Sequence, residues 1–119
     1  MHRNPTSSFF DAMVQNLTVQ QLKDWHNEGA GQPLMLDVRE PWEVQICMLP
    51  GSRHIPMREI AARAHDLPIN GEIVVICHHG HRSQHVANFL ARRGYESVYN
   101  LQGGIDAWAR EVDTRMPRY

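Results

Sequence analysis

The sequence has few cysteines, no long apolar run and no block of one charge. Its two cysteines, Cys47 and Cys77, do not form a Cys-x-x-Cys pair, so free thiols are expected rather than a disulfide framework. The longest apolar runs are far shorter than the roughly 20 residues of a membrane span. The first residues lack the apolar core of a secretory signal. We therefore expect a cytoplasmic protein with no membrane partner.

Net charge and chain length further limit the kind of protein this can be. The formal net charge is -1 and no lysine or arginine cluster stands out, which argues against nucleic acid as a partner. A chain of 119 residues with 42% hydrophobic and 21% charged residues is typical of one soluble folded domain. We expect this domain over residues 17–112, with an N-terminal extension over residues 1–16 and a tail over residues 113–119.

Short apolar runs alternate with amphipathic segments along the chain. A capping box at Thr18 and Gln21 predicts a helix from Val19 to near Gly29. Further helices are expected after residue 40 and over residues 57–67, 83–93 and 105–112, and strands over residues 33–38, 53–56, 71–77 and 97–101. Strands that are apolar on both faces and alternate with helices indicate an α/β fold, with a central parallel sheet of about five strands and helices on both faces.

The stretch ICHHGHRSQHV places Cys77 at the end of the most apolar strand, just before a helix. Ligands of such sheets bind beyond the carboxyl ends of the strands. The pKa of a thiol falls near a helix N-terminus or near cations, so the thiolate nucleophile forms more readily there. The amides of the following residues would then cradle an anion, and Gly80 would allow the backbone to approach it. Cys77 is the predicted nucleophile.

Four ordered motifs resemble the single-domain rhodanese family: LDVREPWEV, PGSRHIP, VVICHHGHRS and GYESVYNLQGGIDAW. The resemblance covers roughly residues 17 to 111. It implies a rhodanese-like fold and sulfur transfer through a persulfide on Cys77. It also implies an active-site loop that binds the transferred sulfur, formed by His78, His79, Gly80, His81 and Arg82, with Ser83 at the start of the next helix.

Two other chemistries compete for the same loop. Related phosphatases carry Cys-x5-Arg, whereas Cys77 and Arg82 form Cys-x4-Arg, which predicts a smaller cradle that fits a sulfur atom. Zinc is the second rival, because the loop is rich in histidine and His81 and His85 are spaced i, i+4. No second Cys/His cluster accompanies the loop, and a metal on Cys77 would block the nucleophile. We therefore expect neither a metal nor another cofactor.

Several residues have both a structural and a functional interpretation. Each loop histidine is either a solvated residue or a source of positive charge for the thiolate and the donor. Arg82 is a candidate for binding an oxyanion through two N–H groups, and Ser83 is expected to cap the helix. Asp37 and Arg39 follow the first core strand and are supporting candidates, with an internal salt bridge as the favoured interpretation. Cys47 stands where the family usually has the first glycine of Gly-His-Ile-Pro-Gly, and its thiol could resolve a persulfide or a disulfide at Cys77.

These observations predict a sulfurtransferase of the thiosulfate sulfurtransferase type. It would take sulfur from a small anionic donor such as thiosulfate, or from a persulfide, which could belong to a partner protein. It would pass the sulfur to a thiol or to cyanide through a Cys77 persulfide. The alternative is a non-enzymatic persulfide carrier, or a regulatory binding module that keeps the rhodanese fold without turnover.

Overall fold

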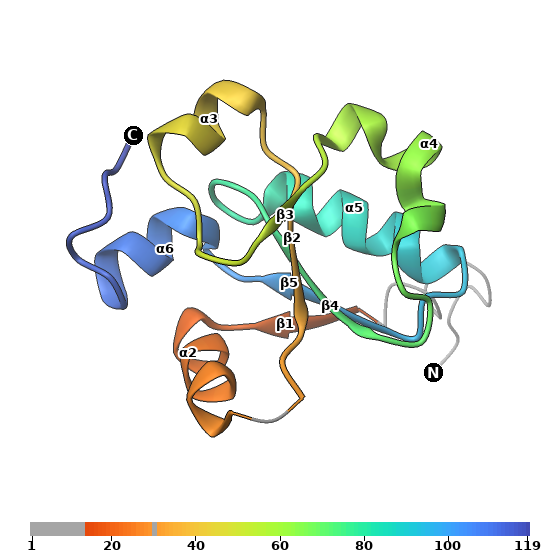
Figure 1. Cartoon of the computed structure of the whole chain (residues 1–119), viewed down its shortest axis with the longest axis horizontal. Coiled ribbons are helices and arrows are strands. Elements are labelled where there is room, and N and C mark those ends of the chain that lie inside the picture. Colours follow the sequence, from red (N-terminus) through yellow and green to blue (C-terminus); the bar gives the residue numbers. More distant parts are fainter. Residues whose placement is uncertain (1–13, 30) are drawn as a thin grey trace, which may run out of the picture.

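The protein is described by a computed structural model over residues 14–29 and 31–119. Five parallel strands form a sheet in the order β1-β5-β4-β2-β3, with helices on both faces (Figure 1). This confirms the predicted α/β fold. The elements in chain order are β1 (Val14–Leu17), α2 (Val19–Glu28), β2 (Leu34–Asp37), α3 (Pro41–Ile46), β3 (Arg53–His54), η1 (Met57–Glu59), α4 (Ile60–Arg63), η2 (Ala64–Asp66), β4 (Glu72–Ile76), α5 (His81–Arg92), β5 (Ser97–Leu101) and α6 (Gly104–Glu111).

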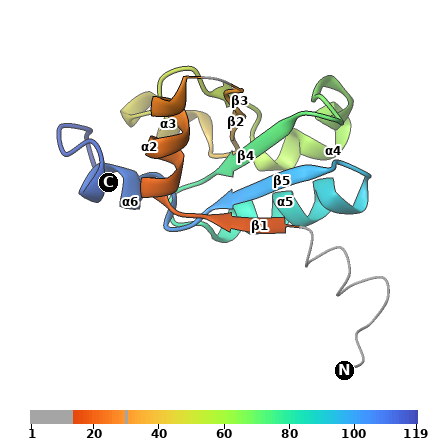
Figure 2. The same ribbon diagram turned by 90° about the horizontal axis from the view of Figure 1, so that it is seen from below.

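The alternating side chains of β4 divide the core into two layers. Ile73 and Val75 pack under α4 and α5, whereas Val74 and Ile76 pack under α2 and α6. All four side chains are fully buried. The view from below shows α5 and α4 on one side of the sheet and α2 and α6 on the other (Figure 2). An apolar side chain is therefore needed at each position from Ile73 to Ile76, because the centre of a parallel strand is covered on both faces.

The structure differs from the predicted elements at three places. Residues 14–17 form the edge strand β1 paired with β5, whereas the sequence predicts residues 14–16 to be part of an N-terminal extension. Residues 1–13 of that extension lie outside the described residues. The single helix expected over residues 57–67 is divided into η1, α4 and η2. Helix α5 begins at His81 rather than Ser83. The capping box of α2 at Thr18 and Gln21 is confirmed.

The C-terminal segment returns to the body of the protein instead of extending away from it. It passes α6 and ends near α3 (Figure 1). There the Tyr119 ring contacts Trp42 of α3 edge to face, at a centroid distance of 5.9 Å. Within the part of the chain that the structure describes, no helix has the length and apolar character needed to cross a membrane.

Candidate active site

Cys77 directly follows β4, which lies between β5 and β2 in the sheet. The residue is only 1% exposed. Asp37, at the end of the neighbouring strand β2, pairs with Ile76 in the sheet register, so both strand ends open on the same edge. The parallel topology therefore places Cys77 at the edge where such sheets bind ligands.

The loop after Cys77 bends back over its sulfur. The Gly80 amide donates a hydrogen bond to Cys77 Sγ at 3.0 Å. Gly80 is the N-cap of α5 with φ +105°, and a Cβ there would lie 3.3 Å from the Gly103 amide nitrogen. A residue other than glycine would be strained and crowded at this position. The Gly80 amide therefore contacts the Cys77 sulfur beside the N-terminus of α5, in the position that the predicted anion cradle requires of it.

Ser83 has a different place from the one expected. Because α5 begins two residues earlier, Ser83 lies inside the helix and does not cap it. Its side chain is fully buried and its Oγ lies 3.2 Å from Cys77 Sγ. The hydroxyl that was expected to bind a helix amide therefore contacts the sulfur of the predicted nucleophile.

Asn100 completes this hydrogen-bond network and was not predicted. Its Oδ1 accepts the Ser83 hydroxyl, and its Nδ2 donates to the Gly80 carbonyl at 3.2 Å and to Gln84 Oε1 at 3.1 Å. Since a hydroxyl has one proton, a neutral Cys77 thiol must donate to Ser83 Oγ while that proton is bound to Asn100. A polar side chain in the apolar run SVYNL was the available sequence signal.

Arg82 does not face an open anion site. Its guanidinium makes a bidentate ion pair with the buried carboxylate of Glu43, at 2.7 Å and 2.8 Å. This pairing lowers the pKa of Glu43 to about 2 and raises the pKa of Arg82. The expectation that Arg82 binds an oxyanion directly does not match this arrangement, because its two forked N–H groups already bind Glu43. Glu43 comes from α3, distant in sequence, and was not predicted.

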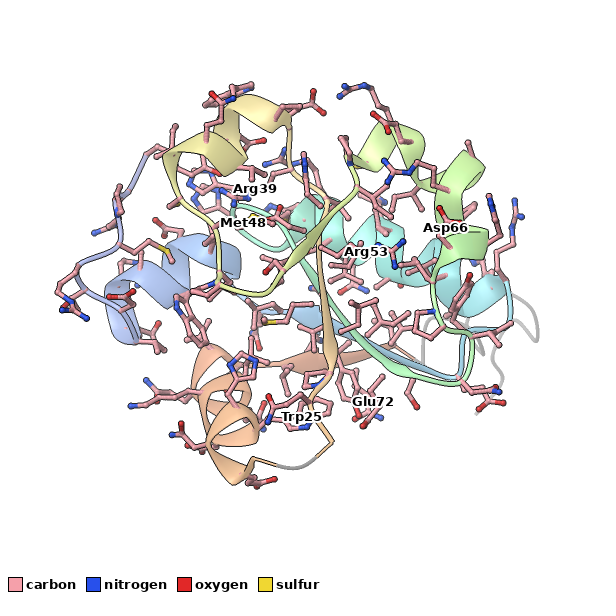
Figure 3. The ribbon with its side chains drawn as sticks, in the orientation of Figure 1. Trp25, Arg39, Met48, Arg53, Asp66 and Glu72 are labelled. Carbon is pink, nitrogen blue, oxygen red and sulfur yellow. The ribbon has the colours of Figure 1, made fainter. Side chains whose placement is uncertain are left out.

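Asp37 and Arg39 form a fully buried ion pair, with Arg39 Nη2 at 2.7 Å from Asp37 Oδ2. Arg39 lies by the connection from β2 to α3 (Figure 3), where it also donates to the Cys47 carbonyl at 2.7 Å. Burial would lower the pKa of Arg39, but the hydrogen bonds of Asp37 and Tyr119 raise it. The internal salt bridge that the sequence favoured is therefore the observed arrangement, and it orders the loop beneath α3.

Tyr119 joins these two ion pairs. Its hydroxyl donates to Glu43 Oε2 at 2.8 Å and accepts from Arg39 Nη1 at 2.8 Å. Burial raises the pKa of Tyr119 to about 12, so the hydroxyl remains protonated at neutral pH. Its ring stacks on that of His78, with centroids 3.9 Å apart and planes 8° apart. The C-terminal segment therefore contributes directly to the surroundings of the loop.

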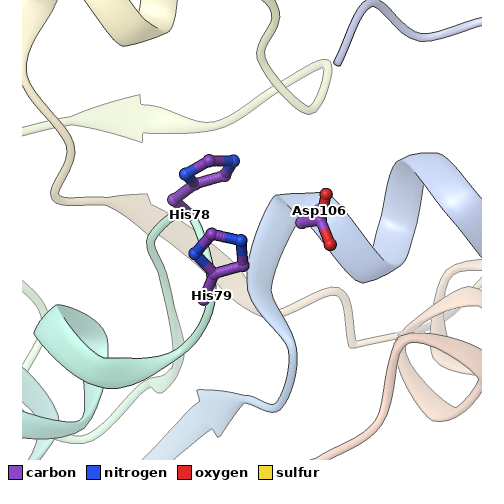
Figure 4. A group of neighbouring side chains, drawn as sticks. All are labelled: His78, His79 and Asp106. Carbon is purple, nitrogen blue, oxygen red and sulfur yellow. The ribbon is translucent and has the colours of Figure 1, made fainter. Parts of the chain in front are cut away.

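The loop histidines occupy different environments. His78 is half-buried between Tyr119 and His79, and burial followed by the charge of His79 lowers its pKa. This direction opposes the predicted role of a protonated His78 as a source of positive charge. His79 and His81 are exposed. His78 and His79 lie near Asp106 of α6, and these three could together hold a metal ion (Figure 4).

Comparison with known protein families matches residues 18–111 to the rhodanese-like domain. The rhodanese-like/PpiC domain-containing protein 12, chloroplastic, of Arabidopsis thaliana is 43% identical over 89 residues, which are 71% of this chain and 30% of that protein. Thiosulfate sulfurtransferase GlpE of Pseudomonas aeruginosa is 30% identical over 94 residues, 79% of this chain and 83% of that protein. The chain thus spans less than a third of the Arabidopsis relative and most of the Pseudomonas one.

A solved structure shows the same fold. The crystal structure of a rhodanese-related protein from Thermoplasma volcanium matches with a TM-score of 0.74 and 31% sequence identity, covering 83% of this chain and 94% of that one. The shared fold therefore includes nearly the whole of that protein.

Proposed function

The chain belongs to the rhodanese-like domain family, a family of sulfur transfer, and we propose that it moves a sulfane sulfur through a persulfide on Cys77. The donor would be thiosulfate or a persulfide, and the acceptor a thiol or, in an assay, cyanide. The relative named thiosulfate sulfurtransferase supports the choice of thiosulfate as the first donor to test.

The observation that carries the proposal is the hydrogen bond that the Gly80 amide donates to the Cys77 sulfur beside the N-terminus of α5. The Gly80 amide lies 3.0 Å from Cys77 Sγ and the Ser83 hydroxyl oxygen lies 3.2 Å from it. Hydrogen bonds to a charged group are stronger than those to a neutral one, so the Gly80 amide stabilises a thiolate more than a thiol. The Ser83 hydroxyl adds a second such bond when its proton turns from Asn100 to the sulfur. The contacts close around a single atom, which fits a sulfur rather than a tetrahedral phosphate.

The first half-reaction loads the enzyme. The Cys77 thiolate attacks the outer sulfur of thiosulfate, a new S–S bond forms, and the S–S bond of thiosulfate breaks with its electron pair on sulfite. The product is a Cys77 persulfide, whose terminal sulfur carries the negative charge.

The second half-reaction returns the free thiolate. Cyanide or a thiolate attacks the terminal sulfur, and the persulfide S–S bond breaks with its electrons on Cys77. Since Cys77 is only 1% exposed, side chains around the loop must move before either partner reaches the sulfur. The two half-reactions share one enzyme group, so ping-pong kinetics are expected.

The test uses Cys77→Ser with Cys47→Ser as its matched control. After treatment with thiosulfate, intact-mass measurement should show one added sulfur atom in the wild type and in Cys47→Ser, and none in Cys77→Ser. Thiosulfate:cyanide transfer should follow the same pattern. A sulfur that maps to Cys47, or full activity in Cys77→Ser, would overturn the proposal.

A phosphatase assay distinguishes sulfur transfer from phosphate hydrolysis, the rival chemistry for this loop. Cys77 and Arg82 are separated by four residues, against five in the related phosphatases, and Arg82 is bound to Glu43. We expect no turnover of an aryl phosphate. Robust turnover would show that the loop accepts a tetrahedral phosphate, in conflict with the proposed size of the cradle.

A further inference from the structure

A group of metal-binding side chains lies beside the Cys77 loop. His78 and His79 come from the loop after β4, and Asp106 comes from α6 (Figure 4). One ligand atom from each residue lies within 4.8 Å of those of the other two. We propose that these three side chains form a binding site for a divalent transition-metal ion such as Zn²⁺.

The backbone already holds the two segments together. The amide of Ile105 donates to the Cys77 carbonyl at 2.9 Å, and the amide of Asp106 donates to the His78 carbonyl at 3.0 Å. Loop and helix are thus joined next to the proposed ligands, and few backbone torsions have to be ordered when the ion binds. The sequence contains no second Cys/His cluster that could complete a metal site with the loop histidines. In the structure, the carboxylate of Asp106 on α6 takes that place.

Stacking leaves the imidazole nitrogens accessible. The ring of His78 lies face to face with that of Tyr119 at 3.9 Å, and the His79 ring lies at the same centroid distance but is tilted by 33°. The lone pair of an imidazole nitrogen points outward in the plane of the ring, so a ring stacked on its face does not cover it. Tyr119 also forms a backbone hydrogen bond with the His78 ring, which limits its rotation and leaves the second ring nitrogen for an ion.

Two arginines compete with the ion for Asp106. Arg110 Nε lies 3.1 Å from Oδ2 and Arg118 Nη2 lies 3.4 Å from Oδ1. The Arg118 side chain is 54% exposed and its nitrogen lies 3.4 Å from the Asp106 carboxylate, so this ion pair contributes little to stability even though the Asp106 side chain is only 17% exposed. A metal ion can therefore replace Arg118 on Oδ1 while Arg110 keeps Oδ2 and orients the carboxylate, as second partners of metal ligands usually do.

The donor set selects the class of metal. Two imidazole nitrogens and one carboxylate oxygen suit Zn²⁺ and its transition-metal neighbours, with a fourth position left for water. Ca²⁺ and Mg²⁺ prefer sites built from oxygen ligands alone. The proposed site should therefore bind Zn²⁺ and should not bind Ca²⁺ at comparable concentrations.

The experiment titrates Zn²⁺ calorimetrically into the full chain carrying Cys47→Ser and Cys77→Ser, so that no thiolate contributes. One ion per chain is expected. In this background His79→Ala and Asp106→Asn should each weaken binding by at least about tenfold, since loss of a second partner alone costs about 10- to 100-fold. The matched control is His85→Ala, which disrupts the i, i+4 pair of His81 and His85 and should leave affinity unchanged.

A gain of affinity provides the sharper test. Arg118→Ala removes a cation that competes for Asp106, so Zn²⁺ should bind up to about fivefold more tightly, as expected for the loss of one exposed ion pair. Binding that is lost in His85→Ala and kept in Asp106→Asn would overturn the proposal, as would the absence of any saturable binding. If the chain without cysteines does not fold, the Zn²⁺ affinities of His79→Ala and His85→Ala are compared in the chain that keeps both cysteines, and the same difference between them is expected.

Discussion

Gly104 is the position where one added methyl group should damage the site most. Its φ is +61°, and a Cβ there would lie 2.5 Å from the carbonyl oxygens of both Cys77 and His78. Non-bonded contacts of a Cβ atom are essentially never shorter than 3.0 Å, and both neighbours here are backbone atoms. Gly104→Ala must therefore push the loop away from α6.

The magnitude follows from two contributions. A residue other than glycine in left-handed backbone costs about 1 to 2 kcal/mol. Displacing the loop also breaks the hydrogen bonds from the Ile105 amide to Cys77 and from the Asp106 amide to His78, at about 1 kcal/mol each. We expect a loss of about 3 to 4 kcal/mol in the free energy of unfolding, which lowers the Tm by about 12 to 16 °C in a domain of this size.

Gly31→Ala is the matched control. Gly31 has φ +62°, nearly the same as Gly104, but no atom lies within 4 Å of the Cβ it would gain. It should lose only the backbone contribution of about 1 to 2 kcal/mol. Urea unfolding and thermal melting measure both variants.

Activity provides the second readout. At a temperature where both variants are folded, Gly104→Ala should lose most of its thiosulfate:cyanide transfer, because the displaced loop carries the Gly80 amide that binds Cys77 Sγ. Gly31→Ala should keep its activity. Equal losses of stability in the two variants, with full activity in Gly104→Ala, would refute the reasoning.

Three further predictions concern the ion pairs around the loop. Asp37→Asn leaves the fully buried Arg39 without its carboxylate and should cost about 3 to 5 kcal/mol in urea unfolding; a loss below about 1 kcal/mol would contradict it. Arg82 depresses the pKa of Glu43 from 4.5 to about 2, so the ionised carboxylate stabilises the fold fully above pH 4.5 and loses this effect as the pH falls toward 2. Glu43→Gln should therefore be less stable than wild type at neutral pH, with the difference vanishing near pH 2; a gap that does not change with pH would refute this. Tyr119→Phe removes both hydroxyl contacts and should cost about 1 to 2 kcal/mol by chemical denaturation, whereas an unchanged midpoint would show that the segment contributes nothing.

The central strands and the strand-end position of Cys77 follow from the sequence alone. The runs before Asp37 and Cys77 are apolar at every position, and only a strand covered on both faces requires this. Three further features are also local: Cys77 lies at a strand end, position 80 requires glycine, and four residues separate Cys77 from Arg82. The edge strand β1 escaped prediction because VQNL exposes two polar residues and pairs on one side only.

The tertiary structure decided which polar side chains meet at the loop. Glu43, Asn100, Asp106 and Tyr119 come from α3, β5, α6 and the C-terminal segment, and no local pattern connects them to Cys77. They converge because all strand pairs are parallel, so the carboxyl ends of separate strands lie at one edge of the sheet. Local sequence sets the conformation of each segment, but the partners of Arg82 and Ser83 depend on contacts between segments far apart in the chain.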